Sequence, residues 1–354
     1  MNRLKDSADQ SVGTKAFYVQ AREIVADLYE RNEKLYWIDF VISATAAYTL
    51  VSIFLAMPLT SGIAWLCFVA GGILIYRASM FVHEIVHLPS DSMRRFRNFW
   101  NFYAGLPMMV PSFSYNSHTH HHSSRHYGTE GDGEYLPLAS GSVWGIVAFL
   151  TQIVFQPILV YLRYLILTPI SFLHPKLRRW TLAHASSLVI NFRYEKHARE
   201  GKSTFADTCW EIATWFRAVV MIALVLSGTM PMVRLPKLLL IAMFVLTLNH
   251  LRTLTAHRYR NEGDTMSHMD QFLDSTNVSG NWLTELICPL GLRYHALHHL
   301  FPGLPYHNLG EAHRRLTNQL PSDSAYHDAT FPNLRSVLWD LLASIWDNRK
   351  SAKV

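Results

Sequence analysis

Three clusters of histidine carry the clearest chemical signal in this sequence. His83 and His87 are four residues apart, and the spacing His-x-x-His-His occurs twice, at His118, His121 and His122 and again at His295, His298 and His299. Residues three or four apart share one face of a helix, so we expect the histidines of each cluster to point the same way. Eight imidazoles are too many for one ion of ordinary coordination, but they suit two ions. The clusters therefore predict a two-metal site built almost wholly of histidine.

The composition indicates that lipid surrounds part of the chain. Of 354 residues, 50% are hydrophobic and only 16% are charged, whereas soluble domains are about 25% charged. The net charge of +6 comes partly from arginines beside apolar runs, such as Arg77 and Arg178-Arg179. A membrane surface explains this arrangement better than nucleic acid does. The three cysteines are scattered, which argues against a disulfide framework and against a cysteine-based zinc site.

Four apolar segments are the predicted transmembrane spans. They begin at about Phe40, Ile63, Ile212 and Pro236, and proline or glycine marks the turn within each pair. A helix from Ile63 to Leu88 would be about 39 Å long, which exceeds a hydrocarbon core of about 30 Å. His83 and His87 therefore lie on the part that protrudes from the membrane.

Two further apolar segments are predicted not to cross the membrane. Phe99 to Phe113 is short and is interrupted by Pro107 and Pro111, so we expect an interfacial or re-entrant piece. Val143 to Leu173 is longer, but it contains polar residues and two prolines. If all the clusters serve one site, an even number of crossings must separate the second cluster from the third. We therefore assign residues 143–173 to the interface, as two half-depth helices.

These observations predict an all-α integral membrane protein with four transmembrane helices in two hairpins, interfacial helices and a cytoplasmic cap that carries the histidine boxes. The basic stretch 174–211 makes that face cytoplasmic by the positive-inside rule, together with both termini. Arg234 and Lys237, in the predicted outer turn, count against this orientation. We expect an N-terminal helical segment at 1–36, with its helix from about Thr14 to Arg31, a membrane domain at 37–315 and a C-terminal tail at 316–354.

The order of the boxes among these spans resembles the integral-membrane fatty acid desaturase family. Gly131-Asp132-Gly133-Glu134-Tyr135 after the second box, and Leu300 to Leu309 after the third, are similar to the family's sequences at these places. Leu251 to Tyr259 resembles its Arg-Thr-x-x-x-His stretch. This makes His257, rather than His250, the preferred ninth ligand. The resemblance covers about residues 40–315.

The resemblance implies a membrane di-iron oxidoreductase with dioxygen as co-substrate. Its metal ligands would be His83, His87, His118, His121, His122, His257, His295, His298 and His299. The predicted activity is desaturation of the acyl chain of a membrane lipid, and the alternative is hydroxylation on the same scaffold. His174-Pro175 is followed by Lys176-Leu177 rather than by the two glycines of a fused cytochrome b5 domain. We therefore expect electrons from a separate ferredoxin- or cytochrome b5-like protein.

The roles of several polar residues stay open at this point. Asp132, Asp270 and Asp274 could orient ligand imidazoles by accepting their second N–H, or could be ordinary solvated or capping carboxylates. His120 and His126 break the family spacing and are expected to be bystanders. Glu84 is predicted either to support a ligand or to be solvated.

Two functions from other classes compete with this interpretation. His83-Glu84-Ile85-Val86-His87 is also a literal His-Glu-x-x-His zinc-protease motif with Glu84 as general base. That alternative leaves six clustered histidines unexplained. A metal transporter would need ionisable residues deep inside its spans, whereas these clusters lie at span ends or in loops.

Overall fold

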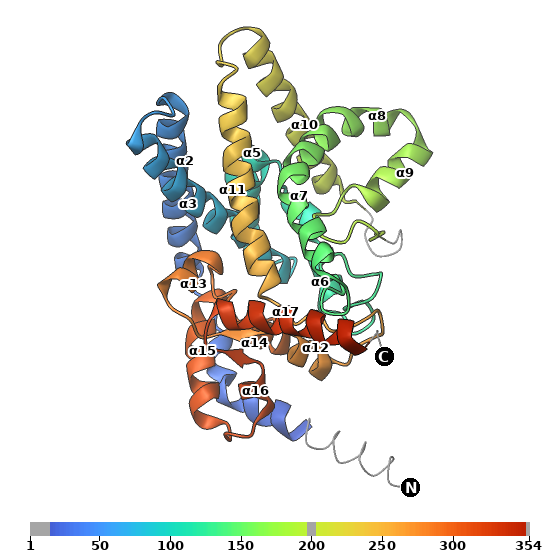
Figure 1. Cartoon of the computed structure of the whole chain (residues 1–354). Helices are drawn as coiled ribbons and strands as arrows, with labels where there is room; N and C mark the ends of the chain where they lie inside the picture. The colour runs from blue at the N-terminus through green and yellow to red at the C-terminus, as the bar shows by residue number, and fades with distance from the viewer. Residues whose placement is uncertain (1–14, 197–202, 352–354) are drawn as a thin grey trace.

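The computed structural model describes residues 15–196 and 203–351, which are helical apart from loops and two strands of two residues each. The first 14 residues of the predicted N-terminal segment and the last three of the tail lie outside this range. Long helices form the upper part of the molecule and shorter ones form a cap below them (Figure 1). Five of the helices in the described part are long and apolar enough to cross a membrane. The chain is therefore an integral membrane protein.

The first hairpin consists of α2 (Glu33–Ala56) and α3 (Gly62–His87). The two helices approach closely at Gly71, where a Cβ atom would lie 3.1 Å from the Val51 side chain. Small residues permit such contact between helices in lipid. α3 ends at His87, and Leu88 and Pro89 follow it. The helix thus carries its two histidines to the edge of the cap, as the sequence predicted.

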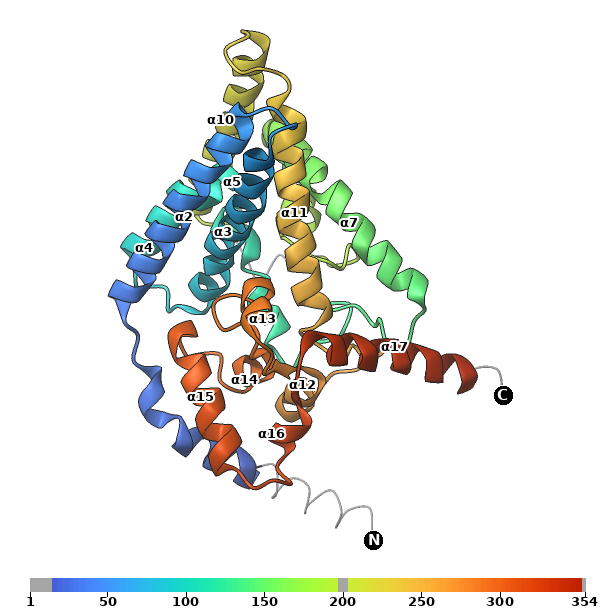
Figure 2. The same ribbon diagram turned by 60° about the vertical axis from the view of Figure 1, so that its left-hand side comes forward.

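The second hairpin consists of α10 (Phe205–Leu226) and α11 (Arg234–Leu254), whose joining turn lies at the top of Figure 2. Lys237, which counted against the predicted orientation, is buried beside the end of α2. Its ammonium group donates to the carbonyls of Phe54, Leu55 and Met57 at 3.1, 3.3 and 2.6 Å. A lysine often satisfies the last carbonyls of a helix in this way. Its charge therefore serves helix packing and is not a free charge on the outer face.

The segment between α3 and the second histidine box enters the bundle and returns. It contains α4 (Arg94–Trp100), a π-helical turn (Asn101–Gly105) and α5 (Leu106–Met108), followed by a 3₁₀ turn (Ser112–Tyr115) and α6 (His118–His121). α5 packs against α10 inside the bundle. Residues 99–113 are therefore a short helical excursion from the cap side.

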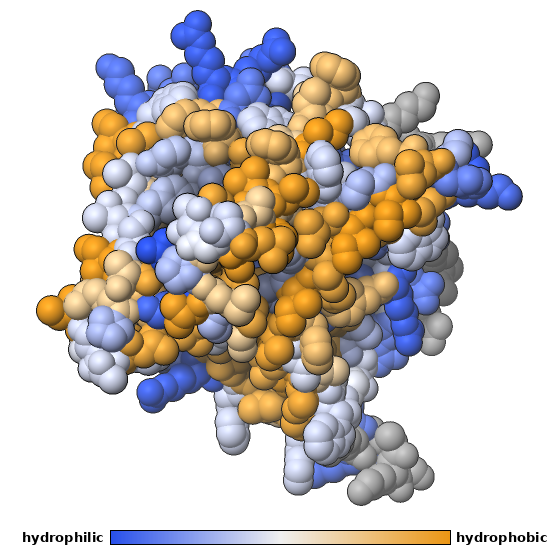
Figure 3. Space-filling view, turned by 90° about the horizontal axis from the view of Figure 1, so that it is seen from above, coloured by the Kyte–Doolittle hydropathy of each residue, from blue (hydrophilic) through white to orange (hydrophobic). Residues whose placement is uncertain are grey.

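Residues 143–173 form one continuous helical run and not the two half-depth helices that we predicted. The run consists of α7 (Val143–Leu162), a π-helical turn (Arg163–Leu167) and α8 (Thr168–Leu173). The π turn absorbs the irregularity near Pro157 and Pro169 without ending the helix. Little of its surface is buried. Seen from above, hydrophobic side chains gather across the middle and the right-hand side of the molecule (Figure 3). By length and composition this run is a fifth candidate span.

The chain just before this run and the chain that returns after α9 nevertheless both contact segments near the histidine boxes. Before the run, the Ala139 amide donates to the Tyr259 carbonyl at 3.1 Å. After α9 (Pro175–His184) the chain turns back along α7, where the Gln152 side chain donates to the Ile190 carbonyl at 2.9 Å. The Ile190 amide in turn donates to the carbonyl of Gly133 at 2.9 Å.

The cap is built from the C-terminal third of the chain. Its elements are α12 (His268–Asp274), β1 (Asn277–Val278), α13 (Trp282–Ile287), α14 (His295–Leu300), α15 (Tyr306–Gln319), α16 (Ala325–Asp328), β2 (Thr330–Phe331) and α17 (Leu334–Ser351). The parallel pair β1–β2 joins the tail to the segment before the third box. Leu341 and Ile345 of α17 pack into the core formed by Tyr127, Tyr135 and Tyr259. At the N-terminus, residues 15–24 and a 3₁₀ turn (Ala26–Tyr29) pack against the same cap.

A buried ion network fixes the outer helices to one another. Glu211 of α10 is 1% exposed, and its carboxylate accepts from Arg163 at 2.8 Å and from Arg178 at 2.7 Å. Arg163 belongs to the π turn and Arg178 to α9, so one carboxylate holds three segments. Removing one member of such a network leaves its partners charged in a low-dielectric interior.

We therefore expect Glu211→Ala to lower the free energy of unfolding by about 3 to 5 kcal/mol, because Arg163 and Arg178 lose their buried counter-ion. Thermal unfolding of the protein in detergent would measure the loss. Glu262→Ala, at an exposed position, serves as the control and should leave the midpoint unchanged. Equal midpoints for the two variants would show that the network does not hold these helices together.

Candidate metal centre

The structure brings all nine predicted histidine ligands together below the ends of α3 and α11. They form two groups whose potential ligand atoms lie within 4.8 Å of one another, namely His83, His87, His118, His122 and His298, and His121, His257, His295 and His299. The chain segments that meet there are far apart in sequence: His121 and His257 are separated by 136 residues. Their role as metal ligands remains a prediction.

Helix geometry divides each box between the two groups. His118 and His122 join the first group while His121 turns to the second; in α14, His295 and His299 join the second while His298 turns to the first. At 3.6 residues per turn, positions i+3 and i+4 point about 100° apart. The expectation that all three histidines of a box face one way was therefore wrong. α6 and α14 each contribute to both groups and so fix the distance between them.

The spacing of the imidazole nitrogens fits a pair of coordinated ions. In the first group, His298 Nε2 lies 3.0 Å from His87 Nε2 and 3.1 Å from His122 Nε2. In the second, His257 Nε2 lies 3.1 Å from His121 Nε2 and 3.0 Å from His295 Nε2. A metal–imidazole bond of about 2.1 Å places neighbouring ligands at a right angle about 3.0 Å apart.

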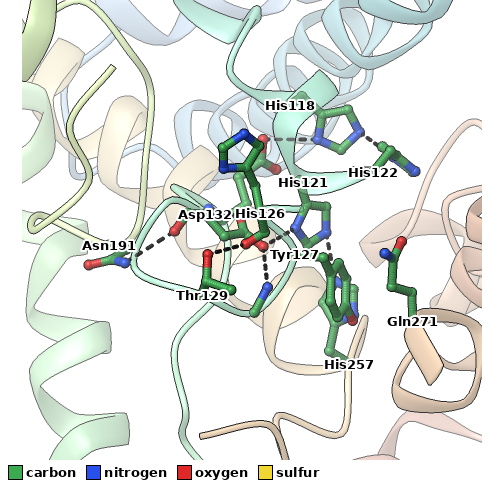
Figure 4. Close-up of polar contacts among 12 residues, drawn as sticks. His118, His121, His122, His126, Tyr127, Thr129, Asp132, Asn191, His257 and Gln271 are labelled. Carbon is green, nitrogen blue, oxygen red and sulfur yellow. Dashed lines mark hydrogen bonds and ion pairs between the residues drawn. The ribbon is translucent and has the colours of Figure 1, made fainter. Parts of the chain in front are cut away.

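Carboxylates and one tyrosine contact the Nδ1 atoms of three of these rings, on the side away from Nε2, and so orient them (Figure 4). His121 Nδ1 lies 2.8 Å from Asp132, and His118 Nδ1 lies 2.9 Å from Glu134. His257 Nδ1 lies 2.9 Å from the Tyr127 hydroxyl, which donates to Asp274 at 2.9 Å. A proton held on Nδ1 leaves the Nε2 lone pair free for a metal.

These contacts distinguish the three predicted orienting residues from one another. Asp132 and Asp274 lie behind the imidazoles, whereas Asp270 caps α12 by accepting from Ser267 and contacts no histidine ligand. Glu134 and Tyr127 were not predicted to orient ligands. Glu134 follows Asp132 by two residues in the stretch that resembles the family, which is the signal that could have identified it.

Glu84 and the other histidines of residues 15–196 and 203–351 lie outside both groups. His250 Nδ1 bonds to the Leu246 carbonyl, and His120 Nδ1 lies 3.1 Å from the Tyr194 hydroxyl. His126 belongs to neither group. Glu84 is buried and not solvated: it accepts from the Tyr36 hydroxyl at 2.6 Å and from the Tyr306 amide at 3.2 Å. It thereby joins α3 to α2 and to the cap, one residue from His83.

The electrostatics of the site also favour bound cations. Burial lowers the pKa of His118, His295 and His298, so these imidazoles are neutral and their lone pairs are available. Burial opposes protonation of His121 as well, but Asp132 outweighs it and raises the pKa of that ring. Burial also raises the pKa of Glu134 to about 7. Cations between the histidines would offset the cost of keeping such carboxylates ionised in the interior.

Unpaired nitrogens point to the same conclusion. Within residues 15–196 and 203–351, neither ring nitrogen of His83 has a hydrogen-bond partner, and the same is true of Nδ1 in His295 and His299. Buried polar atoms without partners are rare in folded proteins. The donor set, the spacing and the unpaired nitrogens therefore fit two imidazole-bound metal ions.

The chain belongs to the fatty acid desaturase family. The family's sequence model, described as fatty acid desaturase, matches residues 59–331, which include all nine clustered histidines. A protein of Caulobacter vibrioides (strain NA1000 / CB15N) described as a ceramide hydroxylase is 38% identical over 339 residues, covering 94% of this chain and 95% of that protein. No solved structure matches the chain.

Family membership and geometry together argue against the zinc-protease alternative. Glu84, its required general base, is held by Tyr36 and Tyr306. His83 and His87 share their group with three further histidines, which a single hydrolytic zinc site does not need.

We expect Asp132→Asn to weaken metal binding about 10- to 100-fold, because the charged acceptor behind His121 is lost. Metal content after dialysis against a graded chelator would measure this. Asp270→Asn is the matched control, since that carboxylate only caps α12, and it should retain the metal content of the unmodified protein. Equal metal retention in both variants would remove Asp132 from the role of orienting residue.

Proposed function

We propose that this protein is a membrane hydroxylase that inserts oxygen into the hydrocarbon part of a ceramide-like lipid. The observation that carries the proposal is the 38% identity, over 94% of the chain, to a protein described as a ceramide hydroxylase. The sequence had favoured desaturation, with hydroxylation as the alternative. The same scaffold supports both reactions, so the histidine boxes do not distinguish them. Similarity to this hydroxylase over nearly the full length of the chain favours hydroxylation.

We propose iron as the metal in both groups. Imidazole ligands suit iron, zinc, copper or nickel. Activation of dioxygen needs an ion that changes its redox state, which zinc does not do. Bound at these histidines, two irons would supply that redox chemistry.

The residues of the chain would hold and shield the centre. The nine histidines provide the ligands, and Asp132, Glu134 and the pair Tyr127–Asp274 keep three of the rings in the orientation that presents Nε2. All but two of the nine are buried, the exceptions being the partly exposed His87 and His122. A dry site allows an oxidant to meet the substrate and not water.

Electrons would enter from a separate ferredoxin- or cytochrome b5-like protein on the cap side. A small pocket lined by Arg31, Glu84, His87 and Pro302–Pro305 opens beside the first group. Partly exposed His87 gives a donor its shortest approach to the ligands there.

We further propose four transmembrane crossings, by α2, α3, α10 and α11, with both termini and the histidines on the cytoplasmic side. In this arrangement the run 143–173 is embedded in the cytoplasmic half of the bilayer. The chain leaves the region of the second histidine box before this run and returns to that region after α9. The hydrogen bonds of Ala139 and Ile190 to that layer support this topology. An odd number of crossings would place the second and third boxes on opposite faces.

Labelling of single cysteines with a membrane-impermeant maleimide would test the topology. In a Cys209→Ser background, Thr229→Cys in the turn between α10 and α11 should react from outside intact cells. Lys176→Cys at the start of α9 should react only after permeabilisation, and Cys67 and Cys288 are buried. Reaction of Lys176→Cys from outside would mean that α7 and α8 cross the membrane.

Mass spectrometry of lipids from ceramide-producing host cells would test the reaction. Cells with the intact protein should contain ceramides heavier by one oxygen, and cells with His298→Ala should not, because a ligand of the first group is missing. The variant should still insert into the membrane and should bind less iron. Ceramides lighter by two hydrogens would instead make the protein a desaturase.

A further inference from the structure

Arg252 is a buried cation near the histidine groups that the reaction, as described so far, leaves without a role. It lies in the last turn of α11, on the membrane side of the site, and is 8% exposed. Its Nε donates to the Asn249 side chain at 3.2 Å and one terminal nitrogen donates to the Thr253 hydroxyl at 3.2 Å. A guanidinium has five N–H donors. The hydrogen bonds of the described residues therefore occupy only part of its capacity.

Other cations in the long helices have strong acceptors. Arg77 pairs with Asp39 at 2.5 Å, Arg163 pairs with Glu211, and Lys237 donates to three carbonyls. Within the described ranges, no carboxylate lies within 4.0 Å of the Arg252 guanidinium, and its polar partners, Asn249, Thr253 and Tyr76, are neutral. A charge in this environment is costly unless hydrogen-bond acceptors surround it, and such charges in membrane helices commonly mark binding sites.

Arg252 lies between the membrane-spanning part of α11 and the metal ligands, five residues before His257. The groups that act most strongly on its charge include the hydroxyls of Tyr76 and Tyr115. Tyr76 precedes His83 by two turns of α3, which is the direction of the membrane. The Tyr115 ring stacks on the His118 ring, with centroids 4.9 Å apart, and lies 6.4 Å from His83. The guanidinium therefore lies near the first histidine group, with the Tyr115 ring packed against one of its ligands.

We propose that Arg252 binds the polar linkage of the lipid substrate, an amide carbonyl with its neighbouring hydroxyl, so that the carbon that is oxidised lies within a few bonds of this linkage. The inference rests on the proposed lipid hydroxylation and specifies where on the lipid it occurs. A substrate oxidised in mid-chain would lay methylene groups against the guanidinium and leave it unpaired. The oxygens of an amide-linked, hydroxylated lipid would satisfy it.

This arrangement also predicts which lipids the site accepts. A site built to hydrogen-bond a polar group rejects analogues that lack the group, because its own donors are then left unpaired. A charge-assisted hydrogen bond corresponds to about a 10- to 100-fold difference in affinity. The site should therefore distinguish a ceramide from an ester of the same fatty acid, which lacks both the amide and the hydroxyl.

Equilibrium binding to the purified, metal-loaded protein in detergent would test Arg252 directly. The probes are a radiolabelled ceramide and an alkane of the same chain length, which has no hydrogen-bond acceptor. Arg252→Gln should bind the ceramide about 10- to 100-fold more weakly and the alkane unchanged. Arg252→Lys keeps the positive charge but loses the planar guanidinium. Its affinity for the ceramide should lie between those of the unmodified protein and Arg252→Gln. Arg314→Gln, at a position with a 64% exposed side chain on α15, should bind like the unmodified protein.

Metal content and the position of the hydroxyl complete the test. Both Arg252 variants should keep their metal, which separates a lost lipid contact from a misfolded site. Tandem mass spectrometry of the product from intact protein should place the new hydroxyl within a few carbons of the amide. A hydroxyl in mid-chain, or equal loss of both probes in Arg252→Gln, would overturn the inference and leave lipid hydroxylation standing. If the intact protein binds the ceramide in an Arg252-dependent way but forms no hydroxylated lipid, the proposed function fails and the contact does not.

Discussion

The convergence of nine imidazoles on two points is the constraint on which the rest of this structure depends. Nitrogen atoms from neighbouring ligands stand 3.0 to 3.2 Å apart, although they come from four separate stretches of chain. The histidine side chain is short, so the helix ends that carry the ligands must themselves lie close together. α3 therefore extends to the cap, α11 ends shortly before His257, and α6 and α14 lie between the two groups.

A second requirement follows from the burial of that cluster. Neutral rings in a dry interior need their tautomers fixed, and the carboxylates that fix them need a compensating positive charge. Asp132 serves more than one purpose, because it orients His121 and also accepts from the amides of Gly128 and Glu134. The shape of the loop and the direction of a ligand thus depend on one carboxylate. Bound cations, loop conformation and ligand orientation are coupled for this reason.

The difference between desaturation and hydroxylation does not reside in the histidines, which both reactions share. It depends on how the lipid chain is placed against them, and therefore on residues on the membrane side of the centre. Arg252 and the tyrosines near it place polar groups on that side, and under the proposed function they would line the substrate site. Such a lining suits a substrate whose reactive carbon lies close to polar groups. It agrees with the relative's description as a ceramide hydroxylase.

Features that depend on local spacing were predictable from the sequence by itself. Hydropathy identified the two hairpins and the long α3, and the three boxes with His257 identified the candidate ligands. Only the tertiary structure decided which histidine belongs to which group, that Glu134 and Tyr127 support the rings, that Glu84 and Lys237 are buried, and that residues 143–173 are one helix. The physical reason is one of range. Helix periodicity and hydrophobicity act over a few residues, whereas the partners of these side chains are set by packing between segments that can be more than a hundred residues apart.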